Sequence, residues 1–188
     1  MTLHNRLMIQ KRGIDLPKIT FLTQAVLLSF LIALSAQIRV PFWPVPLTLQ
    51  TTTILAIGLA YQPRLAIAAV IAYICEGACG LPVFQGMNSG LHYLFGPTGG
   101  YLFGFLPAVA IVSYLKGSQP TFGHLFKVCL LAKVPVYVLG VLWLSSFVGM
   151  KSAVGLGLLP FLLKVPVSIA FAIASSNLID SFKQRFWP

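Results

Sequence analysis

Six apolar segments separated by short polar connections limit this chain to a narrow set of folds. Each is near the ~20 residues that a helix needs to cross a bilayer. The segments are Ile19–Ile38, Leu47–Tyr61, Leu65–Gly80, Gly99–Leu115, Leu125–Val148 and Leu156–Ile179. Because lipid cannot satisfy backbone polar groups, such segments are expected to be helices. The sequence therefore predicts an all-α integral membrane protein, a bundle of six transmembrane helices that forms a single domain over residues 1–188.

Composition supports a membrane protein with several spans. Only 9% of the residues are charged, 57% are hydrophobic, and the mean hydropathy is +0.89. A soluble domain typically carries about a quarter charged residues. The net charge of +10 would suggest nucleic acid in a soluble protein, whereas here it is better explained by loops that face anionic lipid. The three cysteines lack the spacing of a metal site and are expected to be packing residues.

The basic residues predict the orientation. If the N-terminus is inside, the cytoplasmic side carries Arg6, Lys11, Arg12, Lys18, Arg64, Lys116, Lys127, Lys183 and Arg185. The outer side carries only Arg39 and Lys151. This asymmetry follows the positive-inside rule and predicts that the N- and C-termini are cytoplasmic, with residues 1–18 as a cytoplasmic N-terminal segment. Because five more spans follow the first, it is expected to be an uncleaved helix rather than a signal peptide.

The stretch from Leu81 to Gly104 is rich in Gly and contains no Lys, Arg, Asp or Glu. Such a run cannot be a regular helix throughout. Irregular backbone next to membrane spans persists only where protein buries it or where it lines a cavity. The predicted orientation places this stretch and the Pro41–Pro46 loop together on the outer face. Residues 80–98 are therefore predicted to be a Gly-rich outer substrate loop.

Two lysines fall near the middle of predicted spans. Lys133 and Lys164 each begin the tetrapeptide Lys-Val-Pro-Val, and a charge at that depth costs at least ~2.5–3.5 kcal/mol. Each Pro frees the carbonyl four residues earlier, at Leu131 and Leu162, and either carbonyl could accept a hydrogen bond from a lysine. One interpretation is that both lysines snorkel or sit neutral against these carbonyls. The other is that at least one meets an anionic ligand.

The acid count favours an anionic ligand. The chain contains three acids: Asp15, Glu76 and Asp180. Only Glu76 lies within a predicted span, so one carboxylate cannot neutralise two embedded lysines. An excess positive charge in a site of low dielectric favours a carboxylate from elsewhere.

Four pieces in fixed order resemble one family. They are PFWPVPLTLQT (Pro41–Thr51), GLPVF (Gly80–Phe84), GPTGGYL (Gly96–Leu102) and GVLWL (Gly140–Leu144). Together they resemble the BioY family, the biotin-specific S components of energy-coupling factor (ECF) vitamin transporters, and the likeness covers about residues 20 to 180.

The resemblance implies a substrate-capture subunit in a bacterial inner membrane that binds biotin from outside and needs no cofactor. It also implies a transmembrane coupling subunit and two ATPase subunits as partners. No Gly-x-x-x-x-Gly-Lys-Ser/Thr sequence occurs in the chain, so it cannot supply ATP-driven energy itself. An intramembrane hydrolase built on Ser89 and His92 is disfavoured, because no acid nearby would orient the pair. The alternative function is an S component for a different small carboxylated vitamin or nutrient.

Polar and aromatic residues near the outer loops are the predicted ligand contacts. Biotin's ureido ring has one acceptor and two donors, so amide and hydroxyl groups are suitable partners. These are Gln50, Asn88 and Tyr101, each of which could instead make interhelical or loop-capping bonds. The predicted apolar walls are Phe84, Tyr93, Trp143 and Phe161, with ordinary packing as the alternative. Gly99 lies in the turn whose glycines would let backbone approach a ligand.

The last span departs from the family pattern, in which Pro-Phe-Leu-Pro-Gly-Asp-x-x-Lys places an Asp and a Lys in ligand contact. Pro160, Phe161 and Leu162 match its start, but Val165 and Ser168 stand where the Asp and Lys would be. Lys164 lies one turn earlier on roughly the same helix side. We therefore expect Lys164 to substitute for the family lysine as the partner of a ligand carboxylate, and Lys133 to contribute less.

Two further features allow two readings each. Glu76 either braces the outer loops by accepting backbone N–H bonds or pairs with Lys164. Ala25, Ser29 and Ala33 form a stripe of small residues that allows close helix approach. S components resemble one another in using such a stripe against the coupling subunit, and internal packing is the alternative.

Overall fold

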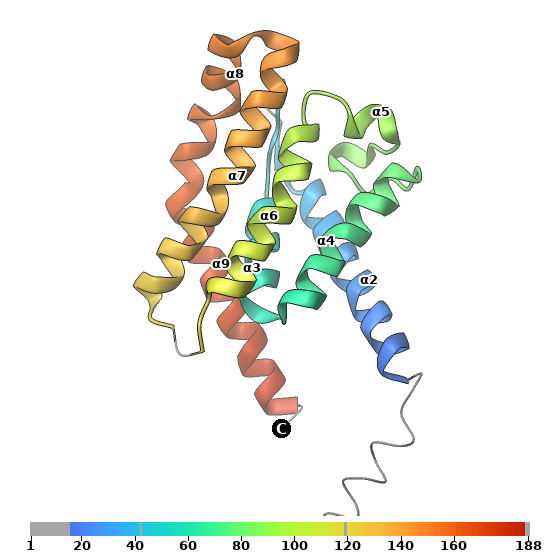
Figure 1. Cartoon of the computed structure of the whole chain (residues 1–188), viewed down its shortest axis with the longest axis vertical. Helices are drawn as coiled ribbons and strands as arrows, with labels where there is room; N and C mark the ends of the chain where they lie inside the picture. Colours follow the sequence, from blue (N-terminus) through green and yellow to red (C-terminus); the bar gives the residue numbers. More distant parts are fainter. Residues whose placement is uncertain (1–15, 42, 119, 187–188) are drawn as a thin grey trace, which may run out of the picture.

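The predicted apolar segments coincide with helices in a computed structural model, which describes residues 16–41, 43–118 and 120–186. The long elements are α2 (Leu16–Gln37), α3 (Gln50–Ala60), α4 (Pro63–Ala78), α6 (Gly99–Leu115), α7 (Phe122–Val148) and α9 (Leu159–Phe186). Shorter elements lie between them: β1 (Arg39–Val40), β2 (Leu47–Thr48), η1 (Gln85–Met87), α5 (Leu91–Leu94) and α8 (Met150–Gly157). In Figure 1 the start of α2 and the end of α9 lie at the lower end of the bundle, and α8 lies at the upper end. The predicted cytoplasmic segment 1–18 falls mostly outside the described residues.

Among the residues that the structure describes, three helical stretches are long and apolar enough to cross a membrane: Thr20–Gln37, Phe122–Val148 and Met150–Ile179. Helices α3 and α6 are apolar but shorter. The 11 residues of α3 correspond to only about 16 Å of helix, roughly half of the hydrocarbon thickness. The count of six full crossings therefore stays a prediction.

Two predicted boundaries are wrong. The second segment was expected to be helical from Leu47, but Leu47 and Thr48 form β2, which pairs antiparallel with β1. The chain enters this strand through Pro44 and Pro46, which favour extended backbone before them. The last segment was expected to begin at Leu156, but α8 ends at Gly157 and α9 begins at Leu159. Pro160 explains the new start, since its missing N–H is tolerated in the first turn of a helix.

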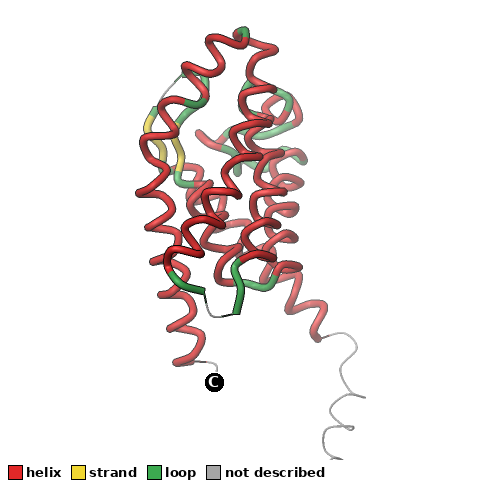
Figure 2. The backbone as a smooth tube through the Cα atoms, turned by 60° about the vertical axis from the view of Figure 1, so that its left-hand side comes forward, coloured by secondary structure: helices red, strands yellow, loops and turns green. Residues whose placement is uncertain are grey.

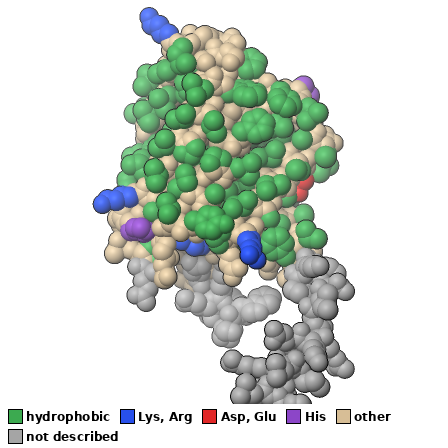
Figure 3. Space-filling view, viewed as in Figure 1, with side chains coloured by type: hydrophobic (Ala, Val, Ile, Leu, Met, Phe, Trp, Pro, Cys, Tyr) green, Lys and Arg blue, Asp and Glu red, His purple; other side chains and the backbone are tan. Residues whose placement is uncertain are grey.

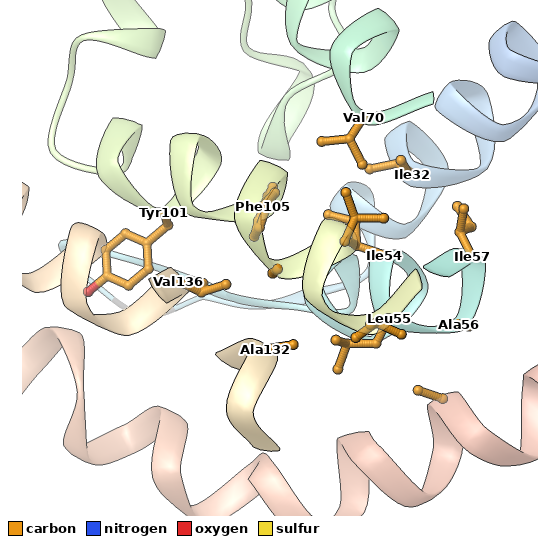
Figure 4. Packing of buried hydrophobic residues seen from close by; sticks show 14 of the residues in the cluster. Ile32, Ile54, Leu55, Ala56, Ile57, Val70, Tyr101, Phe105, Ala132 and Val136 are labelled. Atoms are coloured by element: carbon orange, nitrogen blue, oxygen red, sulfur yellow. The ribbon is translucent and has the colours of Figure 1, made fainter. Parts of the chain in front are cut away.

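Helix α3 forms the centre of the bundle. Nine of its residues are buried, and it packs against α2, α4, α6 and α9. Figure 4 shows Ile54, Leu55 and Ile57 of α3 among side chains from the neighbouring helices. Next to this core, α6 lies very close to α7. At Gly104, an added Cβ would lie only 2.6 Å from the Val136 Cα. Close approach at small residues is the usual packing of helices in lipid.

The surface fits a bundle surrounded by lipid. On the face shown in Figure 3, hydrophobic side chains cover a broad middle band, whereas Lys and Arg side chains lie at the upper and lower margins. Large apolar side chains point outward from the long helices, and Leu163 of α9 is 85% exposed. At the lower end, Lys116 Nζ donates to the carbonyls of Leu59 at 2.6 Å and Tyr61 at 2.7 Å. This places a cation at the C-terminal end of α3, where the helix dipole favours one.

The β1–β2 hairpin and the Gly-rich loop lie in the upper half of the bundle (Figure 2). The loop is more ordered than the sequence suggests, since it contains η1, α5 and an antiparallel bridge between Phe84 and Asn88. Arg39 donates to the Gln85 side chain and so links the hairpin to the loop. The strand that leads into the Pro41–Pro46 loop is therefore in contact with the Gly-rich stretch.

Candidate binding pocket

A cleft lined by aromatic and polar side chains lies between the hairpin, the Gly-rich loop and helices α3, α6, α7 and α9. We call it the central pocket. It contains about 460 Å³ of space free of atoms, with open solvent at its mouth included. Its lining residues are Val45, Pro46, Thr48, Gln50, Thr51, Gln85, Tyr93, Thr98, Tyr101, Leu102, Phe105, Val136, Tyr137 and Phe161. Three of them, Tyr101, Phe105 and Val136, are neighbours in Figure 4.

Four of the sequence-predicted residues line this pocket: Gln50, Tyr93, Tyr101 and Phe161. Phe84 lies behind the wall, where its ring stacks on Tyr93 with centroids 5.2 Å apart. Tyr101 stacks on Phe161 at 5.7 Å, and its hydroxyl donates to the Gly157 carbonyl at 2.7 Å. The Tyr101 hydroxyl therefore fixes the α8–α9 junction, and only its lone pairs remain for a ligand.

A hydrogen-bonded chain fixes the polar side of the pocket. The Gln50 amide nitrogen donates to the Tyr73 hydroxyl at 2.6 Å, and the Thr48 hydroxyl donates to the Gln50 amide oxygen at 3.0 Å. Lys164 Nζ donates to the Thr48 carbonyl at 3.0 Å. Four residues from β2, α3, α4 and α9 are thereby joined. The Gln50 amide is oriented before any ligand arrives.

Asn88, Trp143 and Gly99 do not line the central pocket. The Asn88 amide nitrogen donates to the Gln85 carbonyl at 2.7 Å, and the Trp143 indole donates to the Gly96 carbonyl at 3.0 Å. Both side chains thus hold the Gly-rich loop, which favours the loop-capping alternative for Asn88. Gly99 has no room for a side chain because the Leu94 carbonyl lies against it. Its glycine is explained by this close contact with the backbone, next to the lining residue Thr98.

The two lysines occupy different environments. Lys164 is partly buried, and its partner is the Thr48 carbonyl rather than the carbonyl freed by its own proline. Lys133 is only 1% exposed, so it does not snorkel. Within the described part of the chain, its Nζ has no hydrogen-bond partner. The alternative in which a freed carbonyl accepts from this lysine is therefore not seen among the described residues.

Glu76 performs neither of its two predicted roles. Its carboxylate oxygens lie 2.8 and 3.0 Å from the Ser29 hydroxyl, which donates to them. This bond joins α4 to α2 along an apolar groove that Leu34 and Val83 also line. Glu76 thus lies on the α2 side of α4, whereas Lys164 bonds to the hairpin.

The small-residue stripe lies inside the protein. Ala25, Ser29 and Ala33 are all buried, and α2 packs against α4 and α3. This favours the internal-packing alternative for the stripe. A role for these residues at a coupling interface stays a prediction.

Sequence reasoning missed several residues of the site. Tyr137 lines the pocket, and its ring lies 6.1 Å from Phe161. Tyr73 is fully buried behind Gln50, and Thr48 connects the two halves of the hydrogen-bonded chain. Tyr73 and Tyr137 could have been found from the sequence, because each is a tyrosine within an apolar span, and a buried tyrosine hydroxyl needs a partner. The hairpin contacts of Thr48 had no local signal.

The fold and the cleft define a class: a helical membrane protein with several spans and a cleft lined by aromatic and polar side chains. The sequence model of the BioY family matches residues 8–185. The "Probable biotin transporter BioY" of Pyrococcus horikoshii is 36% identical over 143 residues, which cover 76% of this chain and 85% of the relative. The "Biotin transporter BioY" of Thermotoga maritima is 32% identical over 162 residues, covering 84% and 96%.

A solved structure, described as the S-component for biotin from an ECF-type ABC transporter, matches with a TM-score of 0.73 and 25% identity. The match covers 92% of this chain and 95% of that one. The chain therefore belongs to the BioY family.

Proposed function

We propose that this chain is the substrate-capture subunit of an ECF-type biotin uptake transporter and that it binds biotin from the outer face. The observation that carries the proposal is the central pocket, which lies in a chain of the BioY family at the contact of the hairpin and the Gly-rich loop. Relatives named as biotin transporters and the biotin S-component structure support the same ligand.

The pocket offers the chemistry that biotin requires. Gln50 presents an oriented amide, and hydroxyl groups from Thr51 and Tyr93 line the same cleft. These groups suit a ureido ring with one acceptor and two donors. The ring pair of Tyr101 and Phe161 provides an apolar wall for the sulfur-containing ring, and two lysines near the pocket suit the carboxylate.

The subunit is proposed to lie in a bacterial inner membrane with six crossings, both termini cytoplasmic and residues 80–98 on the outside. A transmembrane coupling subunit and two ATPases would supply the energy, since the chain has no phosphate-binding loop. One observation favours a second candidate, an S component for another carboxylated nutrient. Val165 and Ser168, at the positions of the family Asp and Lys, are both buried.

A binding screen tests both candidates. The purified chain, without ATP, is incubated with radiolabelled biotin and with a panel of other labelled carboxylated vitamins. Saturable binding of biotin alone supports the proposal. Binding of another acid in place of biotin supports the second candidate, and binding of none contradicts both.

A further inference from the structure

Lys133 is a buried lysine whose Nζ has no hydrogen-bond partner among the residues that the structure describes. It lies in the middle of α7 and is 1% exposed. Among the described residues no hydrogen-bond acceptor is in reach of its Nζ. A buried polar group without a partner is rare and costs more than almost any other defect in packing. The Lys133 ammonium group therefore needs an acceptor or an anion as its partner.

Among the described side chains, the acid of the chain does not supply the partner, because Glu76 is bonded to Ser29 between α4 and α2. Asp15 and Asp180 lie outside the predicted spans, whereas Lys133 lies near the middle of one. An anion that pairs with Lys133 is therefore expected to come from a ligand.

The position of Lys133 relates it to the central pocket. It precedes Tyr137 by one helical turn on the same side of α7, and its Nζ lies 6.0 Å from the Tyr137 ring centroid. Tyr137 and Phe161 both line the pocket, and their centroids are 6.1 Å apart. Lys133 thus lies one turn deeper in the membrane than the lining, behind this pair of rings.

Lys164 lies beside Phe161, the second ring of this pair. Its Nζ is 5.0 Å from the Phe161 centroid, but it already donates to the Thr48 carbonyl. A carboxylate that reached Lys164 would have to compete with this bond. At Lys133 the ammonium has no bond to lose, so the gain from a charge-assisted hydrogen bond is larger.

We propose that the central pocket continues between Tyr137 and Phe161 to Lys133, whose ammonium group binds the carboxylate at the end of the ligand's aliphatic tail. Lys164 is then a positioning residue that holds the hairpin through Thr48. The rings of Tyr137 and Phe161 separate as the tail passes. This inference rests on the proposed function and reverses the order of the two lysines that the sequence suggests.

The test compares an acid with its amide. Dissociation constants for biotin and biotin amide are measured on the purified full chain and on Lys133→Met and Lys164→Met. We expect Lys133→Met to weaken biotin binding about 10- to 100-fold, as expected for one charge-assisted hydrogen bond, and to change amide binding less than about 3-fold. Lys164→Met should weaken both ligands by similar factors. Lys127→Met is the matched control, since Lys127 is exposed on the same helix, and it should change neither.

Thermal unfolding without ligand separates binding from folding. Removal of an unpaired buried charge should leave the melting temperature of Lys133→Met equal to or above that of the wild type. A clear drop would show that Lys133 has a partner in the protein and would overturn the inference. Lys133→Gln provides a second neutral variant if the Met variant is poorly expressed.

The outcomes distinguish two failures. If the wild type binds neither biotin nor its amide, the proposed function fails and the inference with it. If the wild type binds biotin but Lys133→Met loses acid and amide equally, or loses less acid binding than Lys164→Met, only the inference fails. In that case the carboxylate binds at Lys164 or outside the lysine pair.

Discussion

Replacement of Tyr73 by Phe tests whether the hydrogen-bonded chain behind the pocket positions Gln50. Tyr73 is fully buried, does not line the pocket, and accepts a hydrogen bond of 2.6 Å from Gln50. The Phe ring retains the edge-to-face contact with Phe84, whose centroid lies 5.6 Å away. Only the hydroxyl is lost, so the change isolates one hydrogen bond.

The magnitude follows from the burial of both partners. Gln50 is 4% exposed, so its amide nitrogen loses its acceptor without gaining water. A buried donor left in this state costs about 1–3 kcal/mol of stability. The Gln50 amide would then be held only by Thr48 and could reorient. We expect biotin binding to weaken about 3- to 10-fold, which corresponds to roughly 0.7–1.4 kcal/mol.

The assay is a double-mutant cycle. Unfolding and biotin binding are measured for Tyr73→Phe, Gln50→Leu and the double variant, with Tyr114→Phe as the control because Tyr114 is exposed on α6. In the Gln50→Leu background, Tyr73→Phe should cost almost nothing, since the bond is already gone. Additive effects, or a Tyr73→Phe variant as stable as the wild type, would refute the argument.

Three other predictions concern orientation, energy and packing. In a background without the native cysteines, a cysteine at Lys151 should react with an impermeant thiol reagent from outside, and one at Lys127 only after permeabilisation; the reverse pattern would invert the proposed topology. The purified chain should bind biotin with ATP absent and hydrolyse no ATP, and measurable hydrolysis by the clean protein would contradict this. Gly77→Ala should lower the free energy of unfolding, measured by thermal unfolding, by about 1–3 kcal/mol, because a Cβ there would overlap the Phe84 ring. The control Gly123→Ala has no atom within 4 Å of the added Cβ and should be neutral; equal losses would exclude the steric explanation.

The sequence predicted the helices well because hydropathy is a local property. Each apolar segment became a helix, and the errors at Leu47 and Leu156 arose where prolines and a hairpin changed the backbone. Polar residues at the outer ends of spans also carried local information, and Gln50 and Tyr101 do line the pocket. The sequence carries no such local information about which distant segments contact each other. The bond from Lys164 to Thr48 joins residues 116 positions apart, and nothing near either residue indicates it.

The contacts of aromatic residues are equally hard to predict from local sequence. Trp143 is one of the residues predicted to form an apolar wall. Its indole N–H instead donates to the Gly96 carbonyl, because a partly buried indole needs an acceptor and the Gly-rich turn offers one. Which helix face meets the pocket depends on the packing of α6 against α7. A sequence pattern does not encode that rotation.

The residues at the family's charged positions on α9 explain why the position of Lys164 matters. On α9, Val165 is part of the apolar core, and the Ser168 hydroxyl donates to the Val165 carbonyl at 2.9 Å. At the two positions that carry charge in the family pattern, Val165 therefore packs in the core and Ser168 makes a hydrogen bond within its own helix. A cation for the ligand carboxylate has to come from elsewhere. Lys164 lies one residue before Val165 and near the Phe161 ring, and Lys133 lies on α7 near the Tyr137 ring. Within the described part of the chain, the Lys133 Nζ on α7 has no hydrogen-bond partner, whereas the Lys164 Nζ on α9 donates to the Thr48 carbonyl.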